Sequence, residues 1–468
     1  MGPKKESLAV YERDIMLKKP SSGFPKNLKD WLGQKKIEEV ECVISDIAGV
    51  VRGKAMPLSK FDRLENVHMP SSVFYQTISG DYVDLPIINQ WTENDMILTP
   101  DISTAICSPW ADDITVQVIC DVLDLDGNPI EVVPRNVLKK VIGLFQQKGW
   151  DPVVAPEIEF YLTKPNIDPS LAIEPMLGRT GRKLASRQAY SMTAVDEYGR
   201  VIDDIYDFAE AQGFEIDTIN QEGGAGQIEI NLVHGDPLKL ADQVFFFKRT
   251  IREAALRHNC FATFMAKPMQ EEPGSAMHIH QSIRDLESGQ NIFVNKKGDP
   301  SKYFYNFLAG QQVYLPKAIC LLAPYVNSYR RYVATGSAPI NLEWARDNRT
   351  TGLRIPISSS YDLRIENRVG GMDCNPYLGI AASLACGFLG IKKKLKPREE
   401  LIGEAYTMPR ALPHGIIEGL EILNEAPELE TILGKSFCSI YKSLKRHEAE
   451  SFSQVISPWE REHLLLNV

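Results

Sequence analysis

The chain lacks closely spaced cysteines. Its eight cysteines are scattered over 468 residues and form no Cys-x-x-Cys pair. This arrangement argues against a zinc ribbon and against a disulfide scaffold, and it suits a reducing compartment. The first residues, MGPKKESLAV, also lack the apolar stretch of a secretory signal. We therefore expect a cytoplasmic protein.

An excess of positive charge and a membrane-spanning run are also missing. The chain has 52 Lys and Arg against 61 Asp and Glu, a net charge of −9, which gives no support for nucleic-acid binding. One apolar stretch, residues 376–391, is shorter than the ~20 residues that a membrane span needs. Asn375 as a cap and Pro376 at the first helical position predict a buried core helix there.

The common nucleotide-binding loops are absent. Residues 222–227 are rich in glycine but lack the Gly-Lys-Ser/Thr ending of a P-loop. Residues 434–436 have that ending, but Leu429 stands where the first glycine is required. If ATP binds, it binds outside these loops.

The composition is that of a soluble globular protein, with 44% apolar and 24% charged residues, and the length predicts two domains. We expect an α+β protein with a flexible N-terminal arm over 1–26, a β-rich domain over 27–132 and a catalytic domain over 133–468. Strands are predicted at 41–46, 50–56, 105–110 and 114–122, and helices at 28–34, 135–148, 237–258 and 303–322.

Four short runs carry polar residues at every second position, so each predicts a strand with one polar face. A single run of this kind is also typical of a solvated edge strand, but four together indicate a polar cavity built into a sheet. The runs are Glu157-Ile-Glu159, Gln227-Ile-Glu229-Ile-Asn231, His278-Ile-His280-Gln-Ser282 and Arg364-Ile-Glu366-Asn-Arg368.

These runs, with Glu222, supply five carboxylates and two imidazoles. Carboxylates one strand step apart repel each other unless cations hold them, and carboxylate-rich sites suit Mg²⁺ or Mn²⁺. Scattered surface glutamates are the alternative. Arginines form a second set, and beside metals they indicate phosphoryl transfer, whereas a solvated basic strip is the plainer interpretation. They are Arg330, Arg331, Arg349, Arg354, Arg364 and Arg368.

The chain resembles the glutamine synthetase superfamily from about Glu38 to its C-terminal region. The segments that carry the resemblance are ISDIAGVVRGK (44–54), APEIEFYL (155–162), NQEGGAGQIEI (220–230), KPMQEEPGSAMHIHQSI (267–283), NLEWARDNRTTGLRIPI (341–357) and RIENRVGGMDCNPYLGIAASL (364–384). The resemblance implies an N-terminal β-grasp domain and a catalytic domain whose antiparallel sheet forms a funnel. It also implies a homo-oligomer, for the bacterial type a dodecamer, whose active sites are shared between subunits.

The resemblance further implies a role for each matching residue, with two divalent metals, ATP as co-substrate and glutamate as the acid. One metal would be held by Glu159, Glu222 and Glu229, and the other by Glu157, His278 and Glu366. Glutamate would be held by Arg331, Arg368, Gly274 and Glu159. ATP would be held by His280, Ser282, Arg349, Arg354 and Arg364. Asp46 would act as a base in a neighbouring subunit's site, and Arg354 would assist phosphoryl transfer.

Two positions depart from glutamine synthetase itself. A flap glutamate that accepts a proton from ammonium aligns here with Ser337, and an asparagine that helps to hold glutamate aligns with Pro273. Loss of a charge-assisted hydrogen bond at Ser337 costs ~1.5–3 kcal/mol, which handicaps ammonium and leaves room for an alkyl chain.

This pattern is similar to the γ-glutamylpolyamine and γ-glutamylputrescine synthetase branch, in which Tyr190 would line the amine pocket. The hypotheses are therefore an ATP-dependent glutamate–amine ligase, a true glutamine synthetase that uses ammonia, and a non-catalytic member of the superfamily. The intact metal and arginine sets count against the third.

Overall fold

The computed structural model describes residues 24–63, 67–83, 93–185, 187–333 and 338–468. Its N-terminal part is built on a six-stranded sheet in which β1 and β6 are parallel and the other pairs antiparallel. The predicted arm over residues 1–26 lies almost wholly outside the described residues. The strand order is β2 (Val51–Pro57), β1 (Glu39–Ser45), β6 (Thr115–Leu123), β4 (Asp95–Pro100) and β3 (Val67–Pro70), with β5 (Ile106–Cys107) paired to β6.

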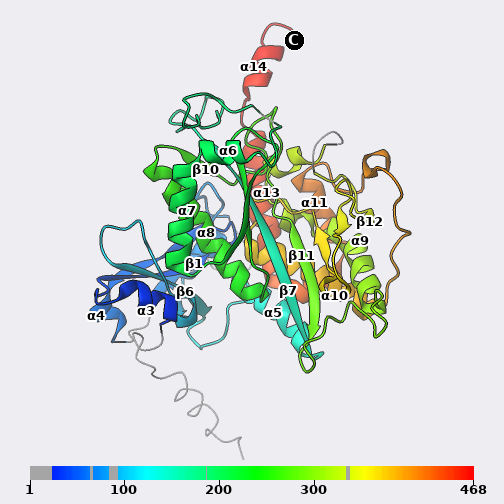
Figure 1. The fold of residues 1–468 in the computed structure, drawn as a ribbon, viewed down its shortest axis with the longest axis horizontal. Helices are drawn as coiled ribbons and strands as arrows, with labels where there is room; N and C mark the ends of the chain where they lie inside the picture. The colour runs from blue at the N-terminus through cyan, green and yellow to red at the C-terminus, as the bar shows by residue number, and fades with distance from the viewer. Residues whose placement is uncertain (1–23, 64–66, 84–92, 186, 334–337) are drawn as a thin grey trace, which may run out of the picture.

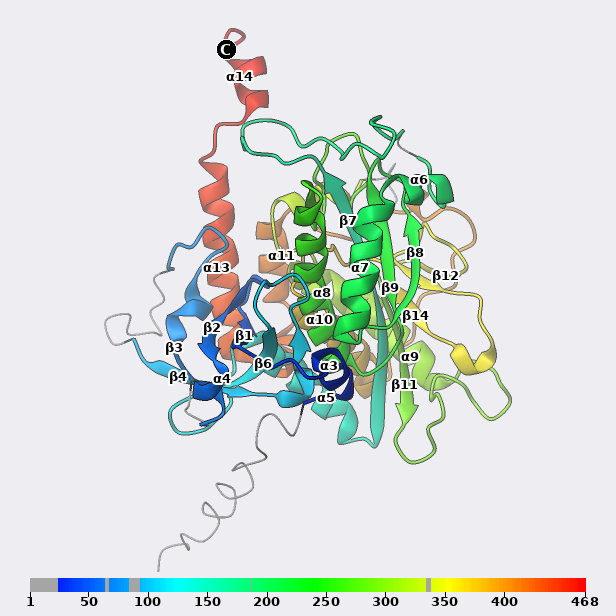
Figure 2. The same cartoon turned by 60° about the vertical axis from the view of Figure 1, so that its left-hand side comes forward.

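The second part contains an eight-stranded sheet, with helices packed behind it (Figures 1 and 2). Its strands are antiparallel, as the resemblance implies, except for the parallel pair β12 and β13. The order is β12 (Trp344–Arg346), β13 (Leu353–Ile355), β14 (Ile365–Asn367), β11 (Ile279–Asp285), β7 (Trp150–Thr163), β9 (Gln227–Leu232) and β8 (Ile216–Gln221), with β10 (Phe261–Thr263) paired to β7.

The helices confirm most of the periodic segments, whereas the predicted strand over 105–110 shrinks to β5. That strand ends early because the chain turns at Ser108, whose carbonyl accepts the Ala111 N–H. The helices are α3 (Lys26–Leu32), α4 (Leu58–Phe61), α5 (Pro134–Gln146), α6 (Met192–Glu197), α7 (Gly199–Gln212), α8 (Pro237–Arg257), α9 (Lys302–Leu322), α10 (Pro376–Lys393), α11 (Ile416–Leu423), α12 (Pro427–Leu433), α13 (Lys435–Ser453) and α14 (Pro458–Leu464), with short 3-10 helices η1 (Ser71–Tyr75), η2 (Ile102–Thr104), η3 (Asn327–Arg331), η4 (Ser360–Asp362) and η5 (Ala405–Thr407).

Helix α10 is the central helix of the core. It begins as predicted, with the Asn375 side chain accepting the Tyr377 N–H and Pro376 in the first turn. Every residue from Pro376 to Gly390 is buried. Among the described residues, no helix combines the length and apolar character needed to cross a membrane.

A buried arginine at the start of α5 joins the N-terminal part to helix α8, which packs behind the second sheet. Arg135 is 4% exposed and bonds Asp101 and Asp121 of the N-terminal part and Asp242 of α8. Tyr377 of α10 donates a further bond to Asp242 at 2.7 Å. Because three carboxylates from both parts surround one guanidinium, the N-terminal sheet is fixed against the helices behind the second sheet.

Helices α9 and α10 cross at Gly310 and Gly390, which leave no room for a side chain. Gly143 in α5 has free space beside it, so alanine substitutions at Gly390 and Gly143 are expected to have opposite effects. A Cβ on Gly390 would overlap with the Asn306 carbonyl oxygen, whereas a Cβ on Gly143 in α5 meets nothing within 4 Å. Gly390→Ala is therefore expected to destabilise the fold by ~1–3 kcal/mol, and Gly143→Ala to stabilise it by ~0.5–1 kcal/mol. Denaturant unfolding measures both, and equal midpoints for the two variants would contradict this packing.

Candidate active site

The four polar runs predicted from the sequence lie on four neighbouring strands, β14, β11, β7 and β9, of the second sheet. Glu366 lies opposite His280, and Glu159 lies opposite Glu229. Cross-strand partners project to the same face of a sheet, so the alternation in each run places its polar side chains together. The strands are therefore neighbours, and one face of the sheet centre is polar.

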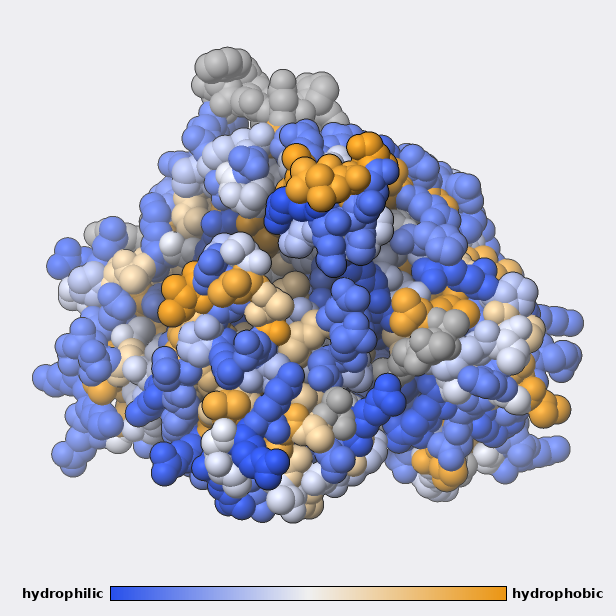
Figure 3. All heavy atoms as spheres, turned by 90° about the horizontal axis from the view of Figure 1, so that it is seen from above, coloured by the Kyte–Doolittle hydropathy of each residue, from blue (hydrophilic) through white to orange (hydrophobic). Residues whose placement is uncertain are grey.

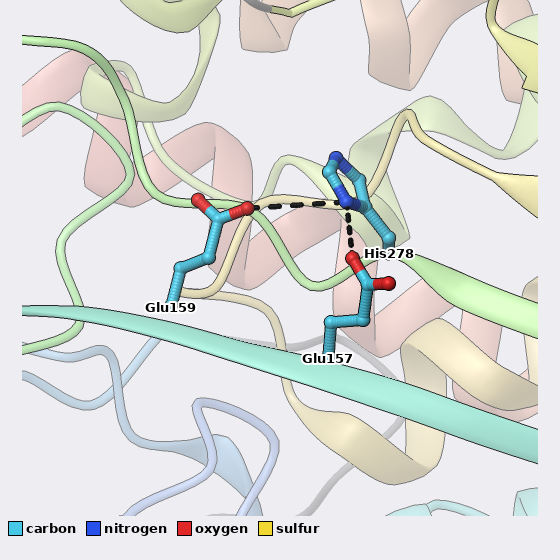
Figure 4. Close-up of side chains that lie close together, drawn as sticks. All are labelled: Glu157, Glu159 and His278. Atoms are coloured by element: carbon cyan, nitrogen blue, oxygen red, sulfur yellow. Dashed lines mark hydrogen bonds and ion pairs between the residues drawn. The ribbon is translucent and has the colours of Figure 1, made fainter. Parts of the chain in front are cut away.

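Glu157 on β7 is the hub of this face (Figure 4). Its two carboxylate oxygens accept from His278 Nδ1 at 2.6 Å and His280 Nε2 at 2.9 Å. Burial acts to raise the pKa of Glu157, but the two histidines outweigh it and hold the pKa well below the usual value. Glu159, one strand step further, lies 3.9 Å from His278 Nδ1.

Beyond Glu157 the face is crowded with acids. Burial first, and then the charge of Glu222, raises the pKa of Glu159 to about 8. Burial and the charges of Glu157, Glu159 and Glu222 raise the pKa of Glu229 to about 10, and burial also raises the pKa of Glu222. Such shifts mean that these carboxylates repel one another when all are ionised, which a bound cation would relieve.

The donor set fits divalent metals. Two groups have ligand atoms within 4.8 Å of one another, namely Glu157, Glu159 and His278, and Glu157, His280 and Glu366. Glu157 belongs to both groups, and His280 takes the place predicted for His278 in the second. The Asn231 Oδ1 atom beside Glu229 is buried without a hydrogen-bond partner among the described residues, so it too can accept from a ligand or face a cation.

Two arginines flank the metal candidates at Glu366. The Glu366 carboxylate accepts from Arg354 Nη1 at 2.7 Å and from Arg368 Nη1. Burial acts to raise the pKa of Glu366, but Arg368 and then His280 outweigh it and keep the pKa below its usual value. The Nε atoms of Arg354 and Arg368 are buried without partners among the described residues. Both guanidiniums therefore keep a donor for an anionic ligand.

The predicted glutamate-binding residues Arg331 and Gly274 lie against each other. Arg331 is 3% exposed and donates to the carbonyls of Val369 and Arg368 at 2.9 and 3.2 Å. A Cβ on Gly274 would overlap with the Arg331 side chain, which explains the glycine. On the other side of the cluster Arg364 donates to His280 Nδ1 at 3.2 Å, and Ser282 follows on β11.

Other predicted residues lie at the rim or away from the cluster. Tyr190 is 63% exposed, but its N–H donates to the carbonyl of Gln221, next to Glu222. Arg349 is exposed and close enough to lower the pKa of Tyr190, although burial raises that pKa overall. Ser337 lies outside the described residues.

Asp46 is not brought to the cluster. It is 2% exposed within its own chain, and its carboxylate accepts the Val50 N–H and the Arg52 Nε–H, both at 2.8 Å. Both oxygens thus stabilise a turn. The predicted role of Asp46 as a base in a neighbouring subunit's site stays a prediction.

Several amide groups that orient the acids were missed by the sequence interpretation. The Asn220 side chain donates to Glu222 at 3.0 Å, and the Asn231 side chain donates to Glu229 at 3.0 Å. In each case the partner is two residues away in the sequence. Glu159 accepts from the Ala276 N–H at 2.7 Å and from Gln227 at 3.3 Å. The i, i+2 spacing of each Asn and Glu was the available signal, because the two side chains share one face.

The fold and this face define a class of enzyme. Clustered carboxylates with two histidines, ringed by arginines with spare donors, are the parts that metal-assisted phosphoryl transfer needs. A family model described as the glutamine synthetase catalytic domain matches residues 131–464. The chain therefore belongs to the glutamine synthetase family and is an ATP-dependent glutamate–amine or glutamate–ammonia ligase. Members of this family use divalent metals.

Full-length relatives agree with this assignment. The chain is 34% identical to γ-glutamylputrescine synthetase PuuA of Escherichia coli, with 95% of this chain and 96% of that protein covered. It is 33% identical to a glutamate–isopropylamine ligase of a Pseudomonas species, with 92% and 96% covered. Glutamine synthetase of Thermus thermophilus shares 31% identity, with 90% and 94% covered.

Solved structures match the fold as well. A structure described as apo GmaS without ligand superposes with a TM-score of 0.79 at 26% identity, covering 93% of this chain and 98% of that chain. A GmaS complex with ADP gives the same TM-score and identity, covering 94% and 99%. The predicted fold class is thereby confirmed.

The acid cluster predicts how pH and metal act on stability. Without metal, Glu159 and Glu229 keep protons in the folded state that unfolded glutamates lose near pH 4.5. The folded state then binds more protons, so the unfolding free energy of the metal-free protein falls as the pH rises from about 5 to about 8. Added Mg²⁺ or Mn²⁺ should reverse this trend and release protons.

The matched variant is Glu229→Gln, which keeps the shape and removes the charge. It should raise the thermal midpoint of the metal-free protein at pH 8 and weaken metal binding at least about tenfold. Thermal unfolding at pH 6 and pH 8, with and without Mn²⁺, measures both effects. A variant that loses stability in metal-free buffer and keeps the full gain from Mn²⁺ would rule out this interpretation.

Proposed function

We propose that the protein joins the γ-carboxylate of glutamate to an organic primary amine in an ATP-dependent reaction, with ammonia as a poorer acceptor. The observation that carries the proposal is that two full-length relatives at 33% and 34% identity are named for organic amines, putrescine and isopropylamine. The charge argument at Ser337 supports the same choice.

The proposed roles follow the geometry of the polar face. Glu157, Glu159, His278 and Glu366, which belong to the two metal-ligand groups, would hold two divalent cations together with Glu222 and Glu229. These cations would neutralise charge on the phosphates when bound. Arg354 and Arg368, with their spare Nε–H donors, would bind the transferring phosphoryl group and the glutamate side chain. Arg331 and the Gly274 backbone would hold the α-carboxylate. His280, Ser282, Arg349 and Arg364 would hold the nucleotide.

The proposed reaction has two steps. The γ-phosphoryl group of ATP moves to the glutamate side-chain oxygen, which yields ADP and an acyl phosphate. A neutral amine then attacks the acyl carbon, the C–N bond forms, and inorganic phosphate leaves with the acyl oxygen. The amine attacks only after its ammonium form has lost a proton, and Asp46, acting in a neighbouring subunit's site, is the proposed acceptor of that proton.

Phosphate release with ATP, Mg²⁺ and glutamate tests the acceptor. We expect kcat/KM for putrescine, spermidine or a monoalkylamine to exceed that for ammonium by ~10- to 100-fold, because ammonium lacks the flap carboxylate. Ser337→Glu should move the preference toward ammonium, and Ser337→Ala serves as the control that adds no charge. An ammonium rate equal to the amine rates would favour the second candidate, a glutamine synthetase, which the 31% identity to the Thermus enzyme supports.

We also propose a homo-oligomer, of dodecameric size as in the bacterial enzymes. The C-terminal helix α14 protrudes from the body beyond α13 (Figure 1), with Trp459, Leu465 and Leu466 at 62%, 75% and 91% exposure. Figure 3, which looks down on this end, shows a largely hydrophilic face interrupted by hydrophobic patches. A protruding apolar segment suits docking on a second copy of the chain.

Deletion of residues 455–468 should therefore reduce the mass of the assembly. Light scattering at equal concentration compares the truncated and full-length chains. Ile402→Ser is the control, because Ile402 is 97% exposed but lies outside the C-terminal segment 455–468. An unchanged mass after truncation would contradict docking by this segment.

A further inference from the structure

A buried polar junction connects the N-terminal part to η3, the short helix that ends at Arg331. We define the junction by six residues: Ser45, Asp46, Tyr325, Ser328, Asp373 and Asn375. On its N-terminal side the Asn375 Nδ2 atom donates to Ser45 Oγ at 3.0 Å and to the Asp46 carbonyl at 2.9 Å. The Tyr325 hydroxyl donates to the Ala48 carbonyl at 3.5 Å. The turn that Asp46 stabilises is thus held by catalytic-domain side chains.

On its catalytic side the junction depends on Asp373. Ser328 Oγ, on η3, donates to Asp373 Oδ2 at 2.6 Å and accepts the Tyr325 N–H at 3.0 Å. Asp373 Oδ1 is buried and has no hydrogen-bond partner among the described residues. Lys248 donates to the carbonyls on either side, those of Met372 and Cys374, and not to the carboxylate. A buried carboxylate with one oxygen unpaired is costly, so a structural role alone accounts poorly for it.

Arg331 lies at the end of η3, the segment that Ser328 bonds to Asp373. Among the described residues Arg331 forms no ion pair, and its hydrogen bonds run to two main-chain carbonyls. Its position therefore depends on where η3 lies. Burial raises the pKa of Asp373, and the positive charges of Lys248 and then Arg331 act to lower that pKa. The hydrogen bond from Ser328 to Asp373 holds η3, and with it the backbone of Arg331, without occupying the donors that a ligand needs.

Helix α13 supports the junction from outside. The Ile78 N–H of the N-terminal part donates to Glu448 Oε1 at 2.8 Å, and Glu448 Oε2 accepts from Lys445 at 2.9 Å. Lys445 is 2% exposed and lies 4.1 Å from the ring centre of Tyr325. In Figure 2, α13 runs beside the N-terminal strands. Two turns of the N-terminal part, at Asp46 and at Ile78, are thus linked by contacts to the segment that carries Arg331.

We propose that Asp373 and Ser328 are positioning residues for the amino-acid substrate, which act by fixing η3 and so Arg331. The inference rests on the proposed role of Arg331 in holding a substrate carboxylate. It adds two residues that make no contact with substrate, and it gives the buried Asp46 turn a function within its own chain. Binding of glutamate, and not of ATP, is the step that these residues govern.

The test uses Asp373→Asn, which keeps the shape and removes the charge, and Ser328→Ala, which removes the hydrogen bond. Each should raise the KM for glutamate about tenfold and change the KM for ATP less than twofold. Because both act through one bond, the double variant should be no worse than about the poorer single variant. Asp285→Asn and Ser443→Ala are matched controls, since their side chains bond only local turn or helix groups.

Glutamate binding measured without an acceptor amine distinguishes a failure of the positioning role from a failure of the proposed amine acceptor. Stabilisation of the protein against heat by glutamate should need a similarly higher glutamate concentration in both variants, whichever amine is the acceptor. Wild-type protein that binds glutamate but uses no amine would therefore overturn the proposed acceptor and leave the junction standing. Variants that fold and keep the wild-type glutamate KM, or that raise the KM of glutamate and ATP equally, would overturn the positioning role.

Discussion

Repulsion among carboxylates on one face of a sheet is the constraint on which this site depends. Glu157 and Glu366 have hydrogen-bond partners within the chain, two histidines for Glu157 and two arginines for Glu366. Glu222 and Glu229 receive only amide donors from Asn220 and Asn231 among the described side chains. The acids at one end of the face, Glu157 and Glu366, thus have basic partners within the chain. Those at the other end, Glu222 and Glu229, have none among the described side chains and need cations from outside the chain.

Sequence alternation was sufficient to predict the polar face, because period two in four runs leaves few other arrangements. It could not predict which strands are neighbours, since cross-strand pairing joins residues more than a hundred positions apart, such as Glu157 and His278. Nor could it predict that His280 bonds Glu157, because histidine type and spacing suit either a metal or a nucleotide. Asp46 shows a different limit, because its predicted role lies in a neighbouring subunit's site, whereas within one chain its two oxygens accept from the turn after it.

The arginines illustrate two ways of orienting a charge. Arg354 and Arg368 are fixed by the Glu366 carboxylate, so their direction is set before any ligand arrives, and each retains a buried Nε–H. Arg331 is instead held by main-chain carbonyls and so depends on the position of its backbone. Preorganised donors contribute most when they need not move during the reaction. The buried polar junction beneath η3 is a way to meet that requirement without using a donor of Arg331.

The location of acceptor selection follows from the same geometry. In the proposed function the strands of the polar face carry the metal and phosphate ligands, so changes there would damage both proposed steps regardless of the amine. Arg187 and Tyr190, both with positive φ, lie instead on a loop whose N–H groups bond the carbonyls of Gly223 and Gln221, on either side of Glu222. A loop anchored at an acid but exposed at its side chains can vary while the cluster stays intact. Relatives named as glutamine synthetases and relatives named for different amines are therefore expected to differ mainly in such loops, where charge and space around one nitrogen decide the acceptor.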